Sequence, residues 1–215
     1  MTFKACLFDL DGVLVDTARF HYLAWKSIAD KLGFVFTEHD NERLKGISRM
    51  GSLDILLEIG KLSLSKEEKV RLAAEKNLLY LNYIQLMTPD DVLPGVLDFL
   101  GELKTNDLRI GLGSASKNAR LILDKTAIVN LFDVIIDGNL ITHAKPDPQV
   151  FALGAQMLKI ENNHCVVFED AVAGIQAAHN AGMKCIGIGS PEVLGEADKV
   201  FPGFTNMKLA DLKFS

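Results

Sequence analysis

The 215-residue sequence contains little cysteine, little proline and no long hydrophobic run. Cys6, Cys165 and Cys185 are far apart and odd in number, which predicts buried thiols rather than a disulfide framework or a metal site. The 6 prolines and the hydrophobic share of 48% argue against a disordered chain. No apolar run approaches the ~18 residues of a membrane helix, and residues 1–4 do not resemble the start of a secretory signal. We therefore expect a globular protein of the reducing cytoplasm.

Charge of neither sign dominates, although acidic residues are in excess. The 28 Asp and Glu outnumber the 23 Lys and Arg, so the formal net charge is −5. This balance argues against nucleic acid or an anionic membrane as the main partner. Residues 17–88 hold 11 basic and 9 acidic residues, whereas the remainder holds 12 and 19. An acidic remainder of this kind would need a metal ion or a basic neighbour to bind an anion.

Short apolar runs alternate with helical patterns, which predicts an α/β fold. We expect strands at 5–8, 109–112, 134–136, 165–168 and 185–188, and helices between them at 96–105, 119–126, 149–158 and 171–181. This alternation is typical of a doubly wound parallel sheet with helices on both faces. Ligands of such sheets bind beyond the carboxyl ends of the strands, which Asp9, Ser114, Asp137 and Glu169 mark here.

A long insert with helical periodicity and no convincing strand interrupts this alternation. Helices are expected at 20–32, 52–59 and 66–86, with a shorter one ending near Lys45. We predict a helical cap domain at 17–87, inserted into a core domain made of 1–16 and 88–215. Two connecting segments form a hinge, an arrangement typical of a lid that opens and closes.

Two pairs of acidic residues follow predicted strands. Asp9 and Asp11 precede Gly12, whose freedom permits a tight turn or a close approach of the backbone. One carboxylate of such a pair can act as a nucleophile and the other as general acid and base. A turn with two exposed acids is the simpler alternative. Glu169 and Asp170 are adjacent, which suits Mg²⁺, although a helix start also attracts acidic residues.

Small hydroxyl and basic residues follow two other predicted strands. Ser114 and Ser116 precede the helix expected at Ala119, where they could bind an anion or simply cap the helix. Lys145 precedes another helix and, taken alone, is a common kind of surface residue. Together the four clusters supply a nucleophile, an acid and base, a metal site and donors to phosphate oxygens. Their joint occurrence predicts Mg²⁺-dependent phosphoryl transfer.

These motifs resemble those of the haloacid dehalogenase superfamily over nearly the whole chain. The resemblance implies a Rossmann-like core with the cap inserted after the first motif. It implies that Asp9 is phosphorylated, that Asp11 is the general acid and base, and that Ser114 and Lys145 hold the transferring phosphoryl group. It further implies that Asp9, Glu169, Asp170 and the main-chain carbonyl of Asp11 bind Mg²⁺.

Within the superfamily, the sequence is most similar to members that move a phosphoryl group between two positions of one sugar. Val13 and the stretch from Leu44 to Arg49 carry much of this closer resemblance. It implies that two phosphates bind at once, with glucose 1,6-bisphosphate as intermediate and activator, and Arg49 could grip the second phosphate. By the same resemblance, His21 contacts Asp11 when the cap closes. The other substrate-binding residues expected are Thr17, Trp25, Lys45, Gly46, Ser48, Ser52, Lys76, Ala115, Ser116, Lys117 and Asn118.

The sequence is compatible with three functions. The first is isomerisation of β-D-glucose 1-phosphate to glucose 6-phosphate, and the second is hydrolysis of a sugar phosphate by the same residues. The third is a catalytically weak protein that binds phosphosugars, which the intact pair of Asp9 and Asp11 disfavours. The expected partner is a small sugar phosphate, with no nucleic acid and no membrane, and we expect a monomer.

Overall fold

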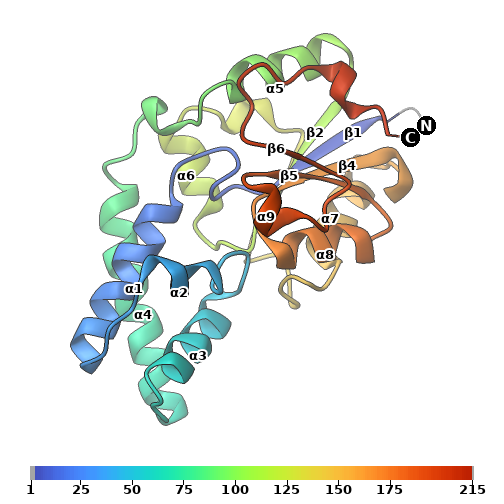
Figure 1. Cartoon of the computed structure of the whole chain (residues 1–215). Coiled ribbons are helices and arrows are strands. Elements are labelled where there is room, and N and C mark those ends of the chain that lie inside the picture. Colours follow the sequence, from blue (N-terminus) through green and yellow to red (C-terminus); the bar gives the residue numbers. More distant parts are fainter. Residues whose placement is uncertain (1–2, 215) are drawn as a thin grey trace.

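Six parallel strands form one sheet in the order β3-β2-β1-β4-β5-β6 (Figure 1). The computed structural model describes residues 3–214, so Met1 and Thr2, part of the segment considered as a signal, lie outside the described residues. The strands are β1 (Ala5–Phe8), β2 (Arg109–Gly113), β3 (Val134–Ile136), β4 (Cys165–Glu169), β5 (Lys184–Ile188) and β6 (Lys199–Phe201). The predicted doubly wound α/β fold is confirmed, with β1 between β2 and β4 at the centre.

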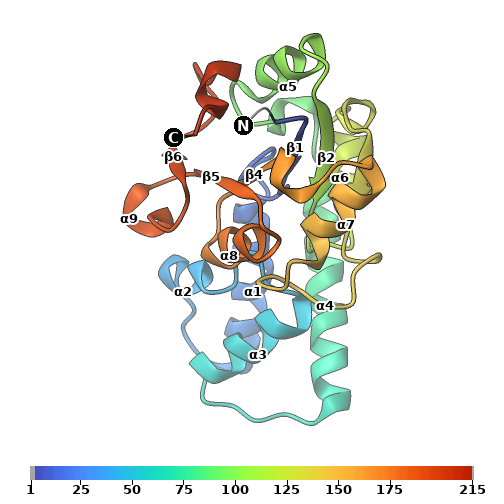
Figure 2. The ribbon, with the colours of Figure 1, turned by 90° about the vertical axis from the view of Figure 1, so that its right-hand side faces the viewer.

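Helices cover both faces of the sheet, because alternate residues of a strand point to opposite sides. Cys6 and Phe8 of β1 pack with α5 and α6 on one face, whereas Ala5 and Leu7 pack with α7 and α8 on the other (Figure 2). Burial on both faces explains why β1 is apolar throughout. The four helices are α5 (Val96–Thr105), α6 (Ala119–Lys125), α7 (Gln149–Leu158) and α8 (Val172–Asn180).

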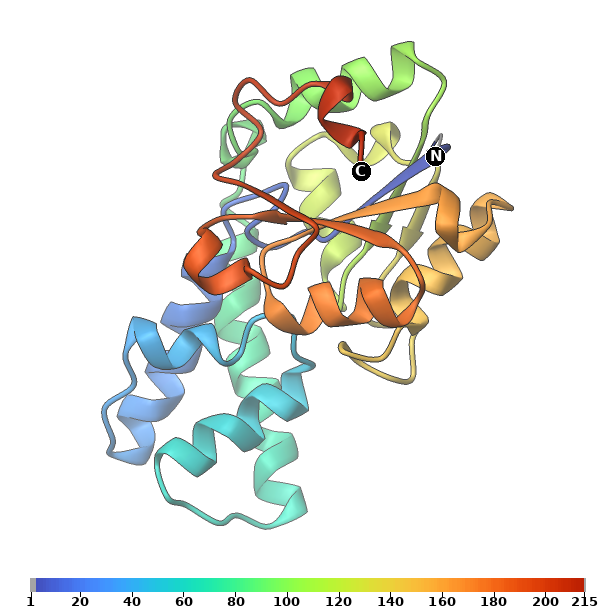
Figure 3. The same cartoon turned by 45° about the vertical axis from the view of Figure 1, so that its right-hand side comes forward.

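Four further helices stand beyond the carboxyl ends of the strands (Figures 1 and 3). They are α1 (Ala18–Leu32), α2 (Glu38–Glu42), α3 (Arg49–Ile59) and α4 (Lys66–Ile84), and we call them the cap. The cap has its own hydrophobic cluster, in which Trp25 and Ile28 of α1 meet Leu53 and Leu72 of the later helices. The limits of the cap as a domain, 17–87, stay a prediction.

The differences from the expected elements lie at the ends of helices and strands and in short segments. Helix α3 begins at Arg49 rather than at residue 52, because the hydroxyl of Ser48 accepts a hydrogen bond from the N–H of Gly51 (3.2 Å). The short cap helix ends at Glu42, before Lys45. Strand β6 and helix α9 (Pro191–Leu194) were not predicted, since three or four residues show no periodicity.

Cys6, Cys165 and Cys185 are all buried and free, as predicted. Across residues 3–214, no helix combines the length and the apolar character that crossing a bilayer would require.

Candidate active site

Chemically active side chains meet at the carboxyl edge of the sheet. Asp9 follows β1, Ser114 follows β2, and Glu169 is the last residue of β4, so neighbouring strands bring them together. Lys145 approaches from the segment between β3 and α7, and Asp170 follows β4 directly. Asp9, Ser114, Lys145 and Glu169 are all buried. The sheet therefore assembles a compact charged cluster from four distant parts of the chain.

Lys145 is the cation at the centre of this cluster. Its ammonium donates to Oδ1 of Asp9 and to Oε1 of Glu169, both at 2.5 Å. Burial opposes the charge of Lys145, but the two carboxylates outweigh it and hold its pKa above the ordinary value. The other oxygen of Glu169 accepts the backbone N–H of Ala171 at 3.0 Å. Lys145 thus neutralises part of the buried acid and orients Asp9.

The cluster still holds more acid than base. Asp9, Glu169 and Asp170 each place one carboxylate oxygen within 4.8 Å of the others. Burial and the charge of Glu169 raise the pKa of Asp170 to about 7, and burial raises the pKa of Asp9 against the opposing effect of Lys145. Crowded hard oxygen donors fit Mg²⁺, because a divalent cation would remove their repulsion. These three side chains are the candidate magnesium ligands.

Two glycines allow the chain to pass close to these acids. A Cβ on Gly174 of α8 would lie 1.9 Å from the carboxyl carbon of Glu169. A Cβ on Gly12, which has a φ of +81°, would lie 2.3 Å from Oδ2 of Asp170. Neither position has room for a side chain, and the backbone of Gly12 also disfavours one.

Replacement of Gly174 by Ala is expected to lower the free energy of unfolding by about 2 kcal/mol, because Glu169 must leave its bonds to Lys145 and Ala171. Urea unfolding measures the change. Gly101→Ala is the matched control, since Gly101 is also helical but a Cβ added there would meet no atom within 4 Å. That change should stabilise the protein by up to ~1 kcal/mol. Similar effects of the two replacements would contradict the packing explanation.

Asp11 connects the core to the cap. Its Oδ1 accepts hydrogen bonds from the hydroxyls of Thr17 and Tyr80, the second at 3.2 Å. Nε2 of His21 lies 3.6 Å from the same oxygen. Burial alone would raise the pKa of Asp11, but His21, Thr17 and Tyr80 outweigh it and lower the pKa. Asp11 is therefore ionised at neutral pH and is held by side chains of α1 and α4.

Lys76 is a buried cation beside this network. Its ammonium lies 2.9 Å from Nδ1 of His21 and packs over the rings of Trp25 and Tyr80. Because an ammonium can only donate, Nδ1 accepts, and the proton of the neutral His21 ring is on Nε2, facing Asp11. Burial and the charge of Arg49 lower the pKa of Lys76 to about 7, and burial and Lys76 lower the pKa of His21.

The buried Lys76 predicts that stability rises with pH above neutrality. The pKa of Lys76 is 10.5 in its unperturbed form and about 7 in the folded protein, so the unfolded chain binds more protons between these values. Through this group the free energy of unfolding should rise by about 2 kcal/mol from pH 7 to pH 9. Urea unfolding of the wild type and of Lys76→Met at both pH values isolates the effect. An equal rise in both proteins would exclude Lys76 as its source.

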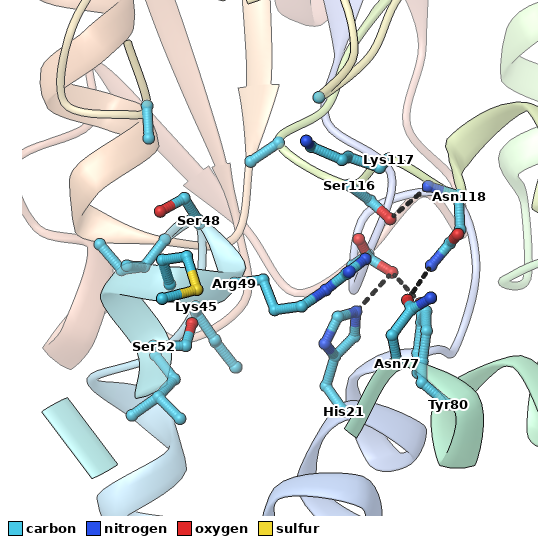
Figure 4. A pocket seen from close by; sticks show the side chains of 18 of the residues that line it. His21, Lys45, Ser48, Arg49, Ser52, Asn77, Tyr80, Ser116, Lys117 and Asn118 are labelled. Carbon is cyan, nitrogen blue, oxygen red and sulfur yellow. Dashed lines mark hydrogen bonds and ion pairs between the residues drawn. The ribbon is translucent and has the colours of Figure 1, made fainter. Parts of the chain in front are cut away.

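A pocket of about 570 Å³ lies between the cap and this edge of the sheet (Figure 4). Asp9, Asp11 and Asp170 line it from the core side. The other predicted residues that line it are His21, Trp25, Lys45, Gly46, Ser48, Arg49, Ser52, Lys76, Ala115, Ser116, Lys117 and Asn118. Two of these also have structural roles, since Ser48 caps α3 and Trp25 is buried in the cap cluster.

Some predicted residues lie behind the pocket wall rather than on it. Thr17 bonds to Asp11, Lys145 and Glu169 lie behind Asp9, and the hydroxyl of Ser114 accepts the N–H of Ser116 at 3.0 Å. Five polar residues that line the pocket were not predicted from the sequence: Asn41, Asn77, Tyr80, Thr142 and His143. For three of these residues, the position in the sequence could have indicated the pocket. Asn77 and Tyr80 share α4 with Lys76, and Asn41 precedes Lys45 by one turn.

Besides the buried Lys76, two cap residues supply positive charge to the pocket. Arg49 extends from α3 across the pocket towards the side that carries Asn118 (Figure 4), and no carboxylate between residues 3 and 214 pairs with it. Lys45 lies 3.0 Å from an oxygen of Glu42 and 3.6 Å from one of Asp170. The cap therefore offers an anion one unpaired guanidinium and one ammonium that already faces the core.

The sheet order, the acid cluster at its carboxyl edge and the inserted helices agree with the haloacid dehalogenase superfamily that the sequence resembles. Residues 3–182 match the family described as haloacid dehalogenase-like hydrolase, and the chain belongs to this family. It is 43% identical to the β-phosphoglucomutase of Bacillus subtilis over 199 residues, which cover 92% of this chain and 88% of the relative.

Other known proteins are similar along nearly the full length. A crystal structure of β-phosphoglucomutase from Clostridium difficile superposes with a TM-score of 0.93 at 43% identity, covering 98% of this chain and 96% of that one. The phosphorylated carbohydrates phosphatase of Thermotoga maritima is 29% identical over 186 residues, 85% of this chain and 83% of the relative. The relatives that match along most of the chain thus include a mutase and a phosphatase.

Proposed function

We propose that the protein acts as a β-phosphoglucomutase and converts β-D-glucose 1-phosphate to glucose 6-phosphate. The observation that carries the proposal is that one pocket offers two places for a phosphate, beside Asp9 on the core side and beside the unpaired Arg49 on the cap side. A mutase needs both, because its intermediate carries two phosphates, whereas hydrolysis of a monophosphate needs one. The 43% identity to β-phosphoglucomutases of two bacteria supports the same choice.

Asp9 is the proposed nucleophile. Lys145 holds Oδ1 of Asp9, and among the described residues no donor bonds to Oδ2, which leaves that oxygen available for attack on phosphorus. Lys145 and Ser114 would then hold the transferring phosphoryl group. Mg²⁺, held by Asp9, Glu169, Asp170 and the carbonyl of Asp11, would offset the negative charge of the phosphoryl oxygens.

Asp11 is the proposed general acid and base. Its lowered pKa keeps it ionised, so it can accept the proton of a sugar hydroxyl as that oxygen attacks phospho-Asp9. The product is glucose 1,6-bisphosphate, which reorients and returns its other phosphoryl group to Asp9 while Asp11 gives the proton back. The bisphosphate would therefore also prime the enzyme. His21 and Tyr80 reach Asp11 from the cap, so closure of the cap over a sugar would bring them to Asp11 and favour transfer to sugar over water.

One assay separates the candidate functions. The protein is given Mg²⁺, β-D-glucose 1-phosphate and a trace of glucose 1,6-bisphosphate, and glucose 6-phosphate and free phosphate are followed together. A mutase forms glucose 6-phosphate with little free phosphate. Release of phosphate without glucose 6-phosphate would instead establish a phosphatase, and formation of neither product would favour a protein that only binds phosphosugars.

Replacement of Arg49 by Ala should distinguish the second phosphate site from the first. We expect mutase turnover to fall by about 10²-fold or more, because a charge-assisted hydrogen-bonded partner of the bisphosphate is lost. Hydrolysis of a small phosphate ester needs only the site at Asp9 and should change by less than about threefold. Both rates are measured on the same preparation. Equal losses in the two reactions would mean that Arg49 does not bind the second phosphate.

We also propose that the protein works as a monomer in the cytoplasm. The three buried free cysteines suit a reducing compartment, and the pocket is formed by residues of a single chain.

A further inference from the structure

Asn41 of α2 lines the pocket with a polar side chain that makes no hydrogen bond to any of residues 3–214. The residue is only 7% exposed, and its Oδ1 is buried without a hydrogen-bond partner. Its amide nitrogen likewise has no partner among residues 3–214. Buried amides in proteins are almost always hydrogen-bonded, because an unpaired one carries the full cost of its desolvation. A ligand bound in the pocket would therefore supply the hydrogen-bond partner that the Asn41 amide lacks.

Hydrogen bonds of the main chain fix the turn that carries Asn41. The N–H of Asn41 donates to the carbonyl of Thr37 (3.1 Å), and its own carbonyl accepts the N–H of Leu44 (2.9 Å). Thr37 in turn caps α2 together with Asp40. Leu44 also lines the pocket, so this turn presents one side to the cavity.

We propose that Asn41 determines specificity by binding a ring hydroxyl of the sugar. A primary amide both donates and accepts, and so does a hydroxyl, whereas an ionised phosphate only accepts. The pocket already has cations for phosphate in Lys45, Arg49 and Lys117. The amide thus suits the ring hydroxyls of a sugar phosphate, whereas these cations suit its phosphate. This inference rests on the proposed function, because it takes the ligand to be a sugar phosphate.

Calorimetric titration of the unphosphorylated enzyme with glucose 6-phosphate in the presence of Mg²⁺ tests the proposal. Asn41→Ala should bind glucose 6-phosphate about tenfold more weakly than the wild type, and inorganic phosphate equally well. The matched control is Asn162→Ala, because the amide of Asn162 donates to the carbonyl of Ala181 (2.8 Å) outside the pocket. This control should bind both ligands as the wild type does. The melting temperature of Asn41→Ala should not fall, since an unpaired amide is removed.

Deoxy analogues identify the contact. Among 2-, 3- and 4-deoxyglucose 6-phosphate, one should bind the wild type about tenfold more weakly than glucose 6-phosphate does. The same analogue and glucose 6-phosphate should bind Asn41→Ala equally. Unchanged affinity of Asn41→Ala for glucose 6-phosphate, or an equal loss for every analogue and for inorganic phosphate, would overturn the proposal.

If Asn41→Ala does not fold, Asn41→Ser is measured in the same way, because its shorter side chain should also lose the contact. The titration needs no turnover, so a wild type that binds glucose 6-phosphate without isomerising it would contradict the proposed function and leave the role of Asn41 intact.

Discussion

Replacement of Asp9 by Asn is expected to lower the turnover of β-D-glucose 1-phosphate by about 10⁴-fold or more. An amide is not a nucleophile towards phosphorus, so no phosphoenzyme can form. The variant should still fold, because Asn has the size of Asp and Lys145 keeps its bond to Glu169. Turnover is measured in the coupled assay, and covalent labelling is followed with glucose 1,6-bisphosphate carrying radioactive phosphate.

Asp16→Asn is the matched control for this experiment. The Asp16 carboxylate is 49% exposed, and its distance of 3.5 Å from the guanidinium of Arg19 is long for an ion pair. Loss of this surface charge should change turnover by less than about twofold. Labelled protein recovered from Asp9→Asn in wild-type yield would show that another side chain carries the phosphoryl group.

Replacement of Lys145 by Met is expected to lower the free energy of unfolding by about 3–5 kcal/mol in the absence of Mg²⁺. The side chain of Lys145 is fully buried, and its loss leaves the buried carboxylates of Asp9 and Glu169 facing each other without a cation. Added Mg²⁺ should recover part of the loss, because it binds the folded state and offsets the same carboxylates. Turnover should fall as well, since Lys145 orients Asp9. Urea unfolding with and without Mg²⁺ measures the change in stability.

Comparison with Lys184→Met separates the effect of burial on stability from the effect of losing a charge pair. Lys184 also bonds to a carboxylate, that of Asp198, but its side chain is 44% exposed. Water screens such a pair, so its loss should cost no more than about 1 kcal/mol, with no recovery by Mg²⁺. Comparable losses in the two lysine variants would contradict the view that burial makes Lys145 indispensable.

The sheet was predictable because buried parallel strands are short apolar runs that stop at a polar residue. Strands β1 and β3 and helices α5 and α7 have the predicted bounds, and the residues that follow the strands meet at one edge. The meeting of Asp9, Ser114 and Glu169 was foreseeable for the same reason, since parallel strands end on the same side. Lys145 lies in the loop after β3, so only the resemblance to the superfamily indicated its place beside them.

Contacts between the cap and the core were harder to predict. Tyr80 is 1% exposed and lies on an amphipathic helix, where an aromatic residue usually belongs to the core. Only the docking of α4 against the first loop shows that its hydroxyl reaches Asp11. In the same way, the sequence shows Gly174 as a helical glycine, and only the packing of α8 on β4 shows that Glu169 occupies the space of its side chain.

The central position of β1 has a consequence for the order in which the protein folds during synthesis. Ala5 pairs with Arg109 and with Cys165, so the first strand made receives its two neighbours only after the whole cap has been synthesised. The cap, by contrast, closes its cluster between Trp25 and Ala73 without any part of the sheet. Contacts between distant residues cost more chain entropy and form later than local ones. On the ribosome, the cap can therefore become compact while β1 is still unpaired. The catalytic centre forms only when β4 pairs with β1 and places Glu169 beside Asp9 and Lys145.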